Sequence, residues 1–198
     1  MKKYKLLVVV DMQNDFVTGT LANPAAEAIV PDIAEYMKSA AADGFRMIMT
    51  ADRHQSSNEA DFIEHDNVPT HRIFGTEGCD IVQPLLDIAT TQFPDDNWDI
   101  VYKNTFAFNP NRAPWEILLE MSWAEIDSLS REDVENHLEK IYICGVCTDI
   151  CVISNALMLR SLFPRVPVYV LSKLCAGTSR EAHEAALQVM KNNCITVV

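Results

Sequence analysis

A cysteine, an aspartate and a lysine each follow a short apolar run that predicts a buried strand. Cys151 comes after the run at residues 141–144 and the break at Gly145, and just after Thr148 and Asp149, either of which can cap a helix. Free N–H groups and the positive dipole end at a helix start favour a thiolate and a neighbouring oxyanion. Cys151 is therefore a candidate nucleophile.

Two side chains of complementary chemistry follow other predicted strands. Asp11 comes after residues 6–10, and Lys103 comes after residues 100–102. Because ligands of open α/β sheets bind at the carboxyl ends of the strands, we expect both near Cys151. A carboxylate can take the thiol proton and pass it to a leaving amine, while an ammonium lowers the pKa of the thiol. This set predicts a cysteine hydrolase.

A second cluster has mixed nitrogen and oxygen donors. Asp52 and His54 stand just beyond the apolar run at 45–50, and His71 follows further along the chain. An Asp-x-His at a strand end with a distant histidine suits a divalent metal such as zinc, iron or manganese. On spacing alone, solvated loop histidines are an equal alternative.

The cysteines also have simpler explanations. A cysteine in a strand–helix turn is most often a small buried hydrophobe. Cys144, Cys147 and Cys151 do not have the spacing of a recognised zinc or iron–sulfur loop, and the C-x-x-C formed by the first two lacks the usual position at a helix start. Acids and lysines after strands are usually solvated. The combination at one sheet edge favours the hydrolase.

Apolar strands alternate with helical segments along the chain. Because this alternation is typical of a parallel sheet covered on both sides, we expect an α/β fold: a doubly wound, mostly parallel six-stranded sheet with helices on both faces, in a single domain over 1–198. A largely buried helix is expected after Cys151, and a long irregular functional loop up to about residue 97. The strands are expected at 6–10, 45–50, 100–102, 141–144, 166–171 and 194–198, and the other helices at 24–42, within 115–138 (the second one capped by Ser130) and at 179–192.

The composition is that of an acidic globular protein. The 198 residues are 48% apolar and 22% charged, with a net charge of −12. The negative charge argues against nucleic acid and anionic membrane surfaces as partners. The start of the sequence turns acidic too soon for a signal peptide, and six irregularly spaced cysteines indicate free thiols in a reducing compartment. We therefore expect a cytoplasmic protein.

Five stretches, in order along nearly the whole chain, resemble the isochorismatase-like cysteine hydrolases, and among them most of all the nicotinamidases and pyrazinamidases. They are residues 11–16 with Gly19 and Leu21, 52–54, 69–71 leading into 75–78, 103–108, and 145–152. The last two stretches are the most diagnostic. The resemblance implies an isochorismatase-like, Rossmann-type three-layer fold, in which residues 112–140 are interpreted as a helical insertion.

The same resemblance implies a mechanism. Asp11, Lys103 and Cys151 would form the catalytic triad, and the backbone N–H groups of Cys147 and Cys151 would form an oxyanion hole, with a cis peptide bond between Val146 and Cys147. The implied reaction is hydrolysis of a small-molecule amide through a thioester, and the nicotinamidase reaction would feed NAD salvage. A homo-oligomer is also expected.

The resemblance further implies one divalent metal ion. Zinc is the expected ion, with iron or manganese as alternatives. It would be bound by Asp52, His54 and His71, with Glu64 as a further candidate ligand. The donor set is the one that the spacing of these residues already suggested.

Two positions near the expected substrate depart from the nicotinamidase pattern. Phe16 and Val68 are expected to line the substrate pocket, but Val68 stands where a tryptophan usually stacks on the ring, and Arg72 replaces a cysteine. The alternative substrate is therefore another small amide, ureido or carbamoyl compound. A non-catalytic metal- or ligand-binding protein on the same fold is the third interpretation.

Overall fold

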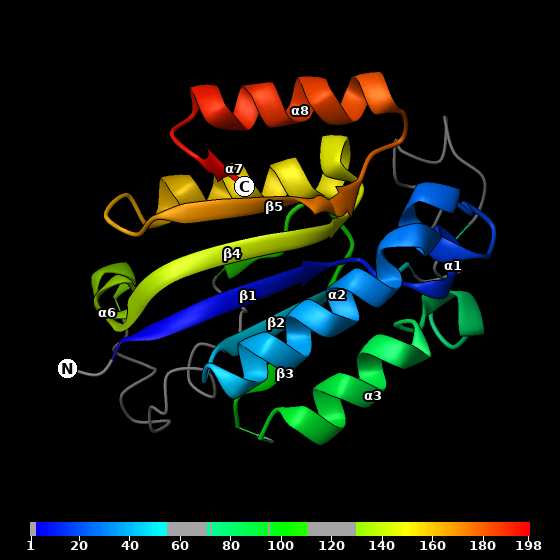
Figure 1. The fold of residues 1–198 in the computed structure, drawn as a ribbon, viewed down its shortest axis with the longest axis horizontal. Helices are drawn as coiled ribbons and strands as arrows, with labels where there is room; N and C mark the ends of the chain where they lie inside the picture. Colours follow the sequence, from blue (N-terminus) through cyan, green and yellow to red (C-terminus); the bar gives the residue numbers. More distant parts are fainter. Residues whose placement is uncertain (1–2, 55–70, 72, 95, 111–129) are drawn as a thin grey trace.

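The computed structural model describes residues 3–54, 71, 73–94, 96–110 and 130–198, and its centre is a six-stranded sheet (Figure 1). All neighbouring strands pair in parallel, in the order β3-β2-β1-β4-β5-β6. The strands are β1 (Tyr4–Val10), β2 (Arg46–Asp52), β3 (Trp98–Lys103), β4 (Leu138–Val146), β5 (Val168–Ala176) and β6 (Thr196–Val197). The predicted doubly wound parallel sheet is confirmed.

Helices cover both faces of this sheet (Figure 1). Helices α2 and α3 pack together on one face, and α7 and α8 pack together on the other. The helical elements are α1 (Asn14–Val17), α2 (Pro24–Ala42), η3 (Glu77–Cys79), α3 (Gln83–Gln92), α6 (Arg131–His137), the π-helical turn η5 (Thr148–Val152), α7 (Ile153–Leu162) and α8 (Arg180–Asn192). None of the helices in the described ranges is long and apolar enough to cross a membrane.

The central strands are buried because each is apolar on both sides. Leu7, Val8 and Val10 of β1 have no exposed surface, and Ile141 and Ile143 of β4 are equally buried. Parallel strands covered by helices on both faces need such continuous apolar runs. The carboxyl ends of β1, β2, β3 and β4 therefore meet at one edge of a rigid core.

Capping side chains define the helix starts. In α2, the side chain of Asn23 accepts a hydrogen bond from the N–H of Ala25, and Pro24 occupies the first turn. Ser130 forms a reciprocal capping box with Asp133 at the start of α6, as predicted. Ser179 accepts from the N–H of an early residue of α8 in the same way.

Three expectations are corrected. Residues 83–92 form α3, although we expected a loop there. Neither Thr148 nor Asp149 caps the helix of Cys151: η5 begins at Thr148 after Cys147, while the Asp149 carboxylate accepts hydrogen bonds from the N–H and hydroxyl of Thr178. Helix α7 is fully buried only along one face, because its other apolar residues are half-buried.

The predicted insertion at 112–140 stays a prediction over residues 112–129, which lie outside the described part of the chain. Its last residues, from Leu138 onward, belong to β4 and pair with β1 at the centre of the sheet. The end of the predicted insertion therefore falls before β4, and not at residue 140.

Gly145 permits the close approach of β4 to β1. It pairs with Val10 and has a φ of +115°, and a Cβ at this position would collide with the backbone nitrogen and carbonyl oxygen of Val10. We expect Gly145→Ala to lower the free energy of unfolding by about 3 kcal/mol or more in urea titrations. Gly44→Ala is the matched control, because Gly44 also has a positive φ (+70°) but nothing near its Cβ position. Equal losses in the two variants would contradict the collision.

Candidate active site

The three side chains predicted for catalysis meet at the carboxyl edge of the sheet. The Nζ of Lys103 lies 2.7 Å from an Oδ of Asp11 and 3.6 Å from the Sγ of Cys151. All three residues are buried. Asp11 directly follows β1, Lys103 is the last residue of β3, and the turn after β4 carries the thiol. The expected juxtaposition of these residues is therefore present.

Asp11 is held in place from two directions. Its φ of +50° is in the left-handed region, so the backbone leaves the extended path of β1 at this residue. The hydroxyl of Thr50, on β2, donates to a carboxylate oxygen of Asp11 at 2.6 Å and accepts from its N–H at 3.1 Å. A non-glycine residue in this conformation, fixed by a buried hydroxyl, is a feature expected at functional sites.

Cys151 lies in η5, directly after β4. The buried side chain of Asn155 donates to the carbonyl of Cys151 at 2.8 Å and accepts from the N–H of Phe108 at 3.0 Å, so it joins the thiol's helix to the segment after β3. The peptide bond between Val146 and Cys147 is cis, as the resemblance implied. Cys151 is thus placed by elements distant in sequence.

Burial dominates the electrostatics of this site. It raises the pKa of the Cys151 thiol well above its usual value, and nearby Asp11 adds to the rise, while Lys103 only partly offsets it. Lys103 lowers this pKa, as expected, but burial and Asp11 outweigh it, so the net shift is upward. Removing a thiolate from water costs more than one nearby cation returns. The resting side chain is therefore a neutral thiol beside a carboxylate that can accept its proton.

Lys103 is charged over a wide pH range. Burial alone would lower its pKa, but Asp11, Cys151 and Asp52 together raise it above the usual lysine value. A lysine whose pKa is raised by folding contributes stability that is fully present below its unfolded pKa of about 10.4 and is lost only as pH rises further. The ammonium is therefore in place at neutral pH, between the carboxylates of Asp11 and Asp52.

The raised thiol pKa has a measurable consequence. Only the thiolate reacts with alkylating agents, so modification of Cys151 by iodoacetamide should be slow at pH 7 and accelerate about tenfold per pH unit to pH 9. Peptide mass spectrometry measures the rate at Cys151 itself and separates it from the other cysteines. A rate that is already constant by pH 7 would show a thiolate in the resting protein.

The three metal-ligand candidates that the structure describes are buried, and Asp52 lies 3.7 Å from Lys103 at the carboxyl edge of the sheet. An imidazole Nε2 of His54 lies 3.5 Å from a carboxylate oxygen of Asp52, and the rings of His54 and His71 are edge-to-face with centroids 5.7 Å apart. Two ligands at about 2.0–2.2 Å from one tetrahedral ion are about 3.4 Å from each other, so the Asp52–His54 pair fits such an ion. Within the described ranges, however, no three His, Cys, Asp or Glu side chains are arranged as a complete metal centre.

The remaining predicted site residues divide into two groups. Phe16 is buried, and its ring centroid lies 6.5 Å from that of His71, so it borders the metal-ligand candidates. Glu64 and Val68 lie outside the described residues.

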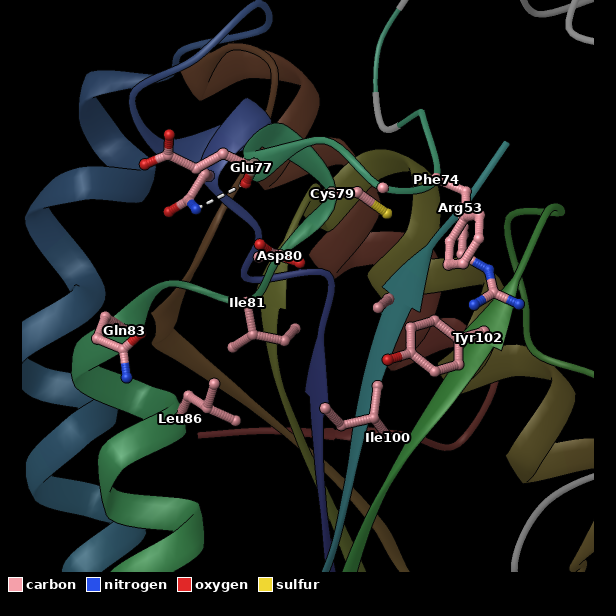
Figure 2. Close-up of a pocket in the computed structure, with 13 residues that line it drawn as sticks. Arg53, Phe74, Glu77, Cys79, Asp80, Ile81, Gln83, Leu86, Ile100 and Tyr102 are labelled. Atoms are coloured by element: carbon pink, nitrogen blue, oxygen red, sulfur yellow. Dashed lines mark hydrogen bonds between the residues drawn. The ribbon is translucent and has the colours of Figure 1, made fainter. Parts of the chain in front are cut away.

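A pocket of about 410 Å³ opens on the other side of β2 (Figure 2). Successive residues of a strand point to opposite faces, so Ala51 and Arg53 line this pocket whereas Asp52 and His54 do not. The catalytic candidates are not among its lining residues. It lies between β2, β3 and the start of α3, and is a separate feature from the triad.

Sequence reasoning missed the residues that hold the site together. Besides Thr50 and Asn155, the buried side chain of Gln13 donates to the carbonyl of Asp52 at 2.8 Å and to that of Cys79 at 2.7 Å, and accepts from the N–H of Asp52. The one available sequence signal for such a supporting residue was Thr50, a polar residue inside an apolar run. Apart from the hydrogen bond of Asn155 to Cys151, the partners of these side chains lie dozens of residues away in the sequence.

A parallel α/β sheet that gathers a buried acid, ammonium and thiol at its carboxyl edge is the arrangement expected of a hydrolase with a cysteine nucleophile. The isochorismatase domain family matches residues 5–107 and 122–198. The chain therefore belongs to the isochorismatase family of hydrolases.

Individual relatives agree with this assignment. The nicotinamidase/pyrazinamidase of Mycobacterium tuberculosis is 26% identical over 204 residues, covering 98% of each chain. The zinc complex of the Pyrococcus horikoshii pyrazinamidase is 29% identical, with a TM-score of 0.71 over 98% of each chain. A nicotinamidase/pyrazinamidase from Bacillus subtilis has a TM-score of 0.79 over 100% of both chains at 24% identity, which establishes the shared fold.

Proposed function

We propose that this protein is a nicotinamidase: a cysteine amidohydrolase that converts nicotinamide and water to nicotinate and ammonia. The observation that carries the proposal is the contact of the Lys103 ammonium with both the Asp11 carboxylate and the Cys151 sulfur in a buried site. A binding protein has no need of an acid, an ammonium and a thiol together. The names of the relatives support an amide of a nitrogen heterocycle as the substrate.

The chemistry follows from the neutral thiol. Asp11 takes the proton of Cys151 as the sulfur attacks the amide carbon, and the resulting oxyanion is stabilised by the N–H groups of Cys147 and Cys151. Asp11 then gives its proton to the leaving nitrogen, the C–N bond breaks, and ammonia departs from a thioester. Asp11 next takes a proton from water, whose oxygen attacks the thioester. The C–S bond breaks, the sulfur regains a proton, and the acid is released.

Lys103 has a distinct role in this sequence. Its charge holds the Asp11 carboxylate in place and opposes the negative charge that passes from carboxylate to sulfur during attack. A fixed cation in a site screened from water stabilises such transient charge more strongly than solvent does. Its contact with Asp52, at 3.7 Å, extends this role to the neighbouring metal-ligand candidates.

We also propose that Asp52, His54 and His71 hold a divalent metal ion. Their donor types, their burial and the spacing of the Asp52–His54 pair support this, and the Pyrococcus horikoshii relative is a zinc complex. A bound ion would supply a Lewis acid that orients or polarises the substrate. His71 would complete the ligand set from a separate segment, and Glu64 is a further candidate ligand.

Metal content tests this second proposal. The purified protein should carry about one divalent ion per chain, and His54→Ala should lose it while His137→Ala, on α6 away from this edge, should keep it. Affinity should fall as pH drops toward about 6.5, because protonated imidazoles do not bind metal. Full occupancy in His54→Ala, measured by elemental analysis, would contradict the ligand assignment.

Ammonia release decides the substrate. We expect turnover of nicotinamide and pyrazinamide by the metal-replete enzyme, with weaker turnover of simple aliphatic amides. Val68 and Arg72 specifically favour the alternative of another small amide, ureido or carbamoyl substrate, because both depart from the nicotinamidase pattern. If a ureido or carbamoyl compound is turned over through Cys151 and nicotinamide is not, the nicotinamidase proposal fails and the alternative replaces it.

A further inference from the structure

The side chain of Arg53 lies between two aromatic rings at the open edge of the sheet. Its guanidinium carbon is 4.6 Å from the ring centroid of Phe74 and 4.2 Å from that of Tyr102 (Figure 2). Phe74 is 62% exposed and Tyr102 is 52% exposed, so burial in the core does not account for the arrangement. The Arg53 guanidinium therefore makes two cation–π contacts, one with each ring, and we call these three side chains the Arg53 cluster.

Two members of the Arg53 cluster are next to residues of the candidate site in the sequence. Tyr102 immediately precedes Lys103, and Arg53 stands between Asp52 and His54. The backbone N–H of Arg53 donates to the carbonyl of Lys103 at 2.7 Å. Arg53 therefore ties the end of β2 to the end of β3.

Phe74 connects the third segment. Its N–H donates to the carbonyl of His54 at 2.8 Å, and Ile73 forms a parallel bridge with His54. His71 lies only three residues before Phe74, on the segment that this bridge fastens to β2. This hydrogen bond and bridge join Phe74 and Ile73 to His54, and the contact of the Phe74 ring with the Arg53 guanidinium adds to the connection from the pocket side (Figure 2).

We propose that Arg53 is a positioning residue: its cation–π contacts with Phe74 and Tyr102 hold Ile73 and Phe74, and through them His71, against the strand ends that carry Asp52, His54 and Lys103. The proposal rests on the proposed metal site. Asp52 and His54 already lie close together at the end of β2, whereas His71 belongs to a segment outside the sheet and must be held beside them. Arg53 acts from the opposite side of β2 and touches none of the reacting groups.

The size of the effect follows from the two contacts. Exposed cation–π contacts contribute about 0.5–1 kcal/mol each, so losing both should raise the opening equilibrium constant at Phe74 by about five- to thirty-fold. Metal binding should weaken by at most this factor, because affinity falls only with the fraction of the protein in which His71 is in place. Arg53→Met removes the charge and the planar group but keeps an apolar chain of similar length. Arg53→Lys keeps a cation and should recover part of the effect.

The first measurement is hydrogen exchange of the Phe74 amide in metal-free protein, since this amide makes the bond to His54. The second is titration of metal-free protein with Co²⁺, whose visible absorption reports both affinity and coordination geometry. Arg53→Met, Phe74→Leu and Tyr102→Leu should each speed the exchange and weaken Co²⁺ binding. The double variant Arg53→Met/Tyr102→Leu should fall short of the sum of its single variants.

Lys5→Met is the matched control. Lys5, like Arg53, is partly exposed and lies over an aromatic ring, that of Phe45 at 5.2 Å, but at the amino end of β1. It should leave Phe74 exchange and Co²⁺ binding unchanged. The proposal is overturned if Arg53→Met changes neither quantity, or if Lys5→Met changes them equally. If the unmodified protein binds no Co²⁺, the metal proposal fails, and Phe74 exchange alone still decides the role of Arg53.

Discussion

Cys151→Ala should abolish amide hydrolysis while the protein remains folded. The sulfur is the only atom of the triad that can form the thioester, so its removal should lower kcat by about 10⁴-fold or more. Removing the sulfur of one buried cysteine, which leaves the methyl side chain of alanine, should keep the sheet intact and change the melting temperature little. In the unmodified enzyme, acid-quenched reactions analysed by mass spectrometry should locate the acyl adduct on the peptide that contains Cys151.

Cys194→Ala is the control for this substitution, because Cys194 is an exposed free cysteine near β6. Its activity should equal that of the unmodified enzyme. An acyl adduct on Cys144 or Cys147 in place of Cys151 would refute the assignment of the nucleophile.

Lys103→Met should damage both activity and stability. The substitution leaves the carboxylates of Asp11 and Asp52 buried without the cation that lies 2.7 and 3.7 Å from them. Leaving buried charges uncompensated costs about 3–5 kcal/mol, so the variant should unfold at a much lower urea concentration. Hydrolysis should slow about a hundred- to a thousand-fold in the fraction that stays folded, because the developing negative charge loses its fixed counter-charge.

The matched control is Lys38→Met on the surface of α2. Lys38 forms an ion pair with Glu35 at 3.3 Å, but both side chains are exposed, and such pairs contribute little. Its unfolding free energy should stay within about 0.5 kcal/mol of the parent. A Lys103→Met protein as stable as Lys38→Met would mean that the buried network does not hold the site together.

Local signals explain which elements the sequence predicts well. Helix α2 begins and ends where expected because Asn23 and Pro24 mark its start and apolar residues recur along its inner face. Helix α3 was missed because no side chain caps its start and its polar residues resemble a loop. Its few apolar residues pack against α2, a contact that only the assembled fold reveals.

The candidate site also combines features that local sequence signals predict with features that only the folded chain reveals. Asp11, Lys103 and Cys151 were predictable because strand ends in a parallel sheet converge. The raised pKa of the Cys151 thiol was not predictable, because it depends on how deeply the thiol is buried, and all elements at this edge of the sheet contribute to that burial. The cap assigned to Asp149 failed for a related reason: Thr178, from the loop after β5, binds that carboxylate instead.

The pairing of β1 with β4 also fixes when the site can form during synthesis. Val10 pairs with Thr50 about 40 residues later, but its other neighbour, Gly145, emerges from the ribosome about 135 residues after it. Closing so long a loop is slow, and until β4 docks, one edge of β1 can pair with other nascent chains. At 5–20 residues per second this interval lasts roughly 7–27 seconds. The thiol of Cys151 meets Asp11 only after that step, so enzymatic activity should appear late and report completion of the sheet.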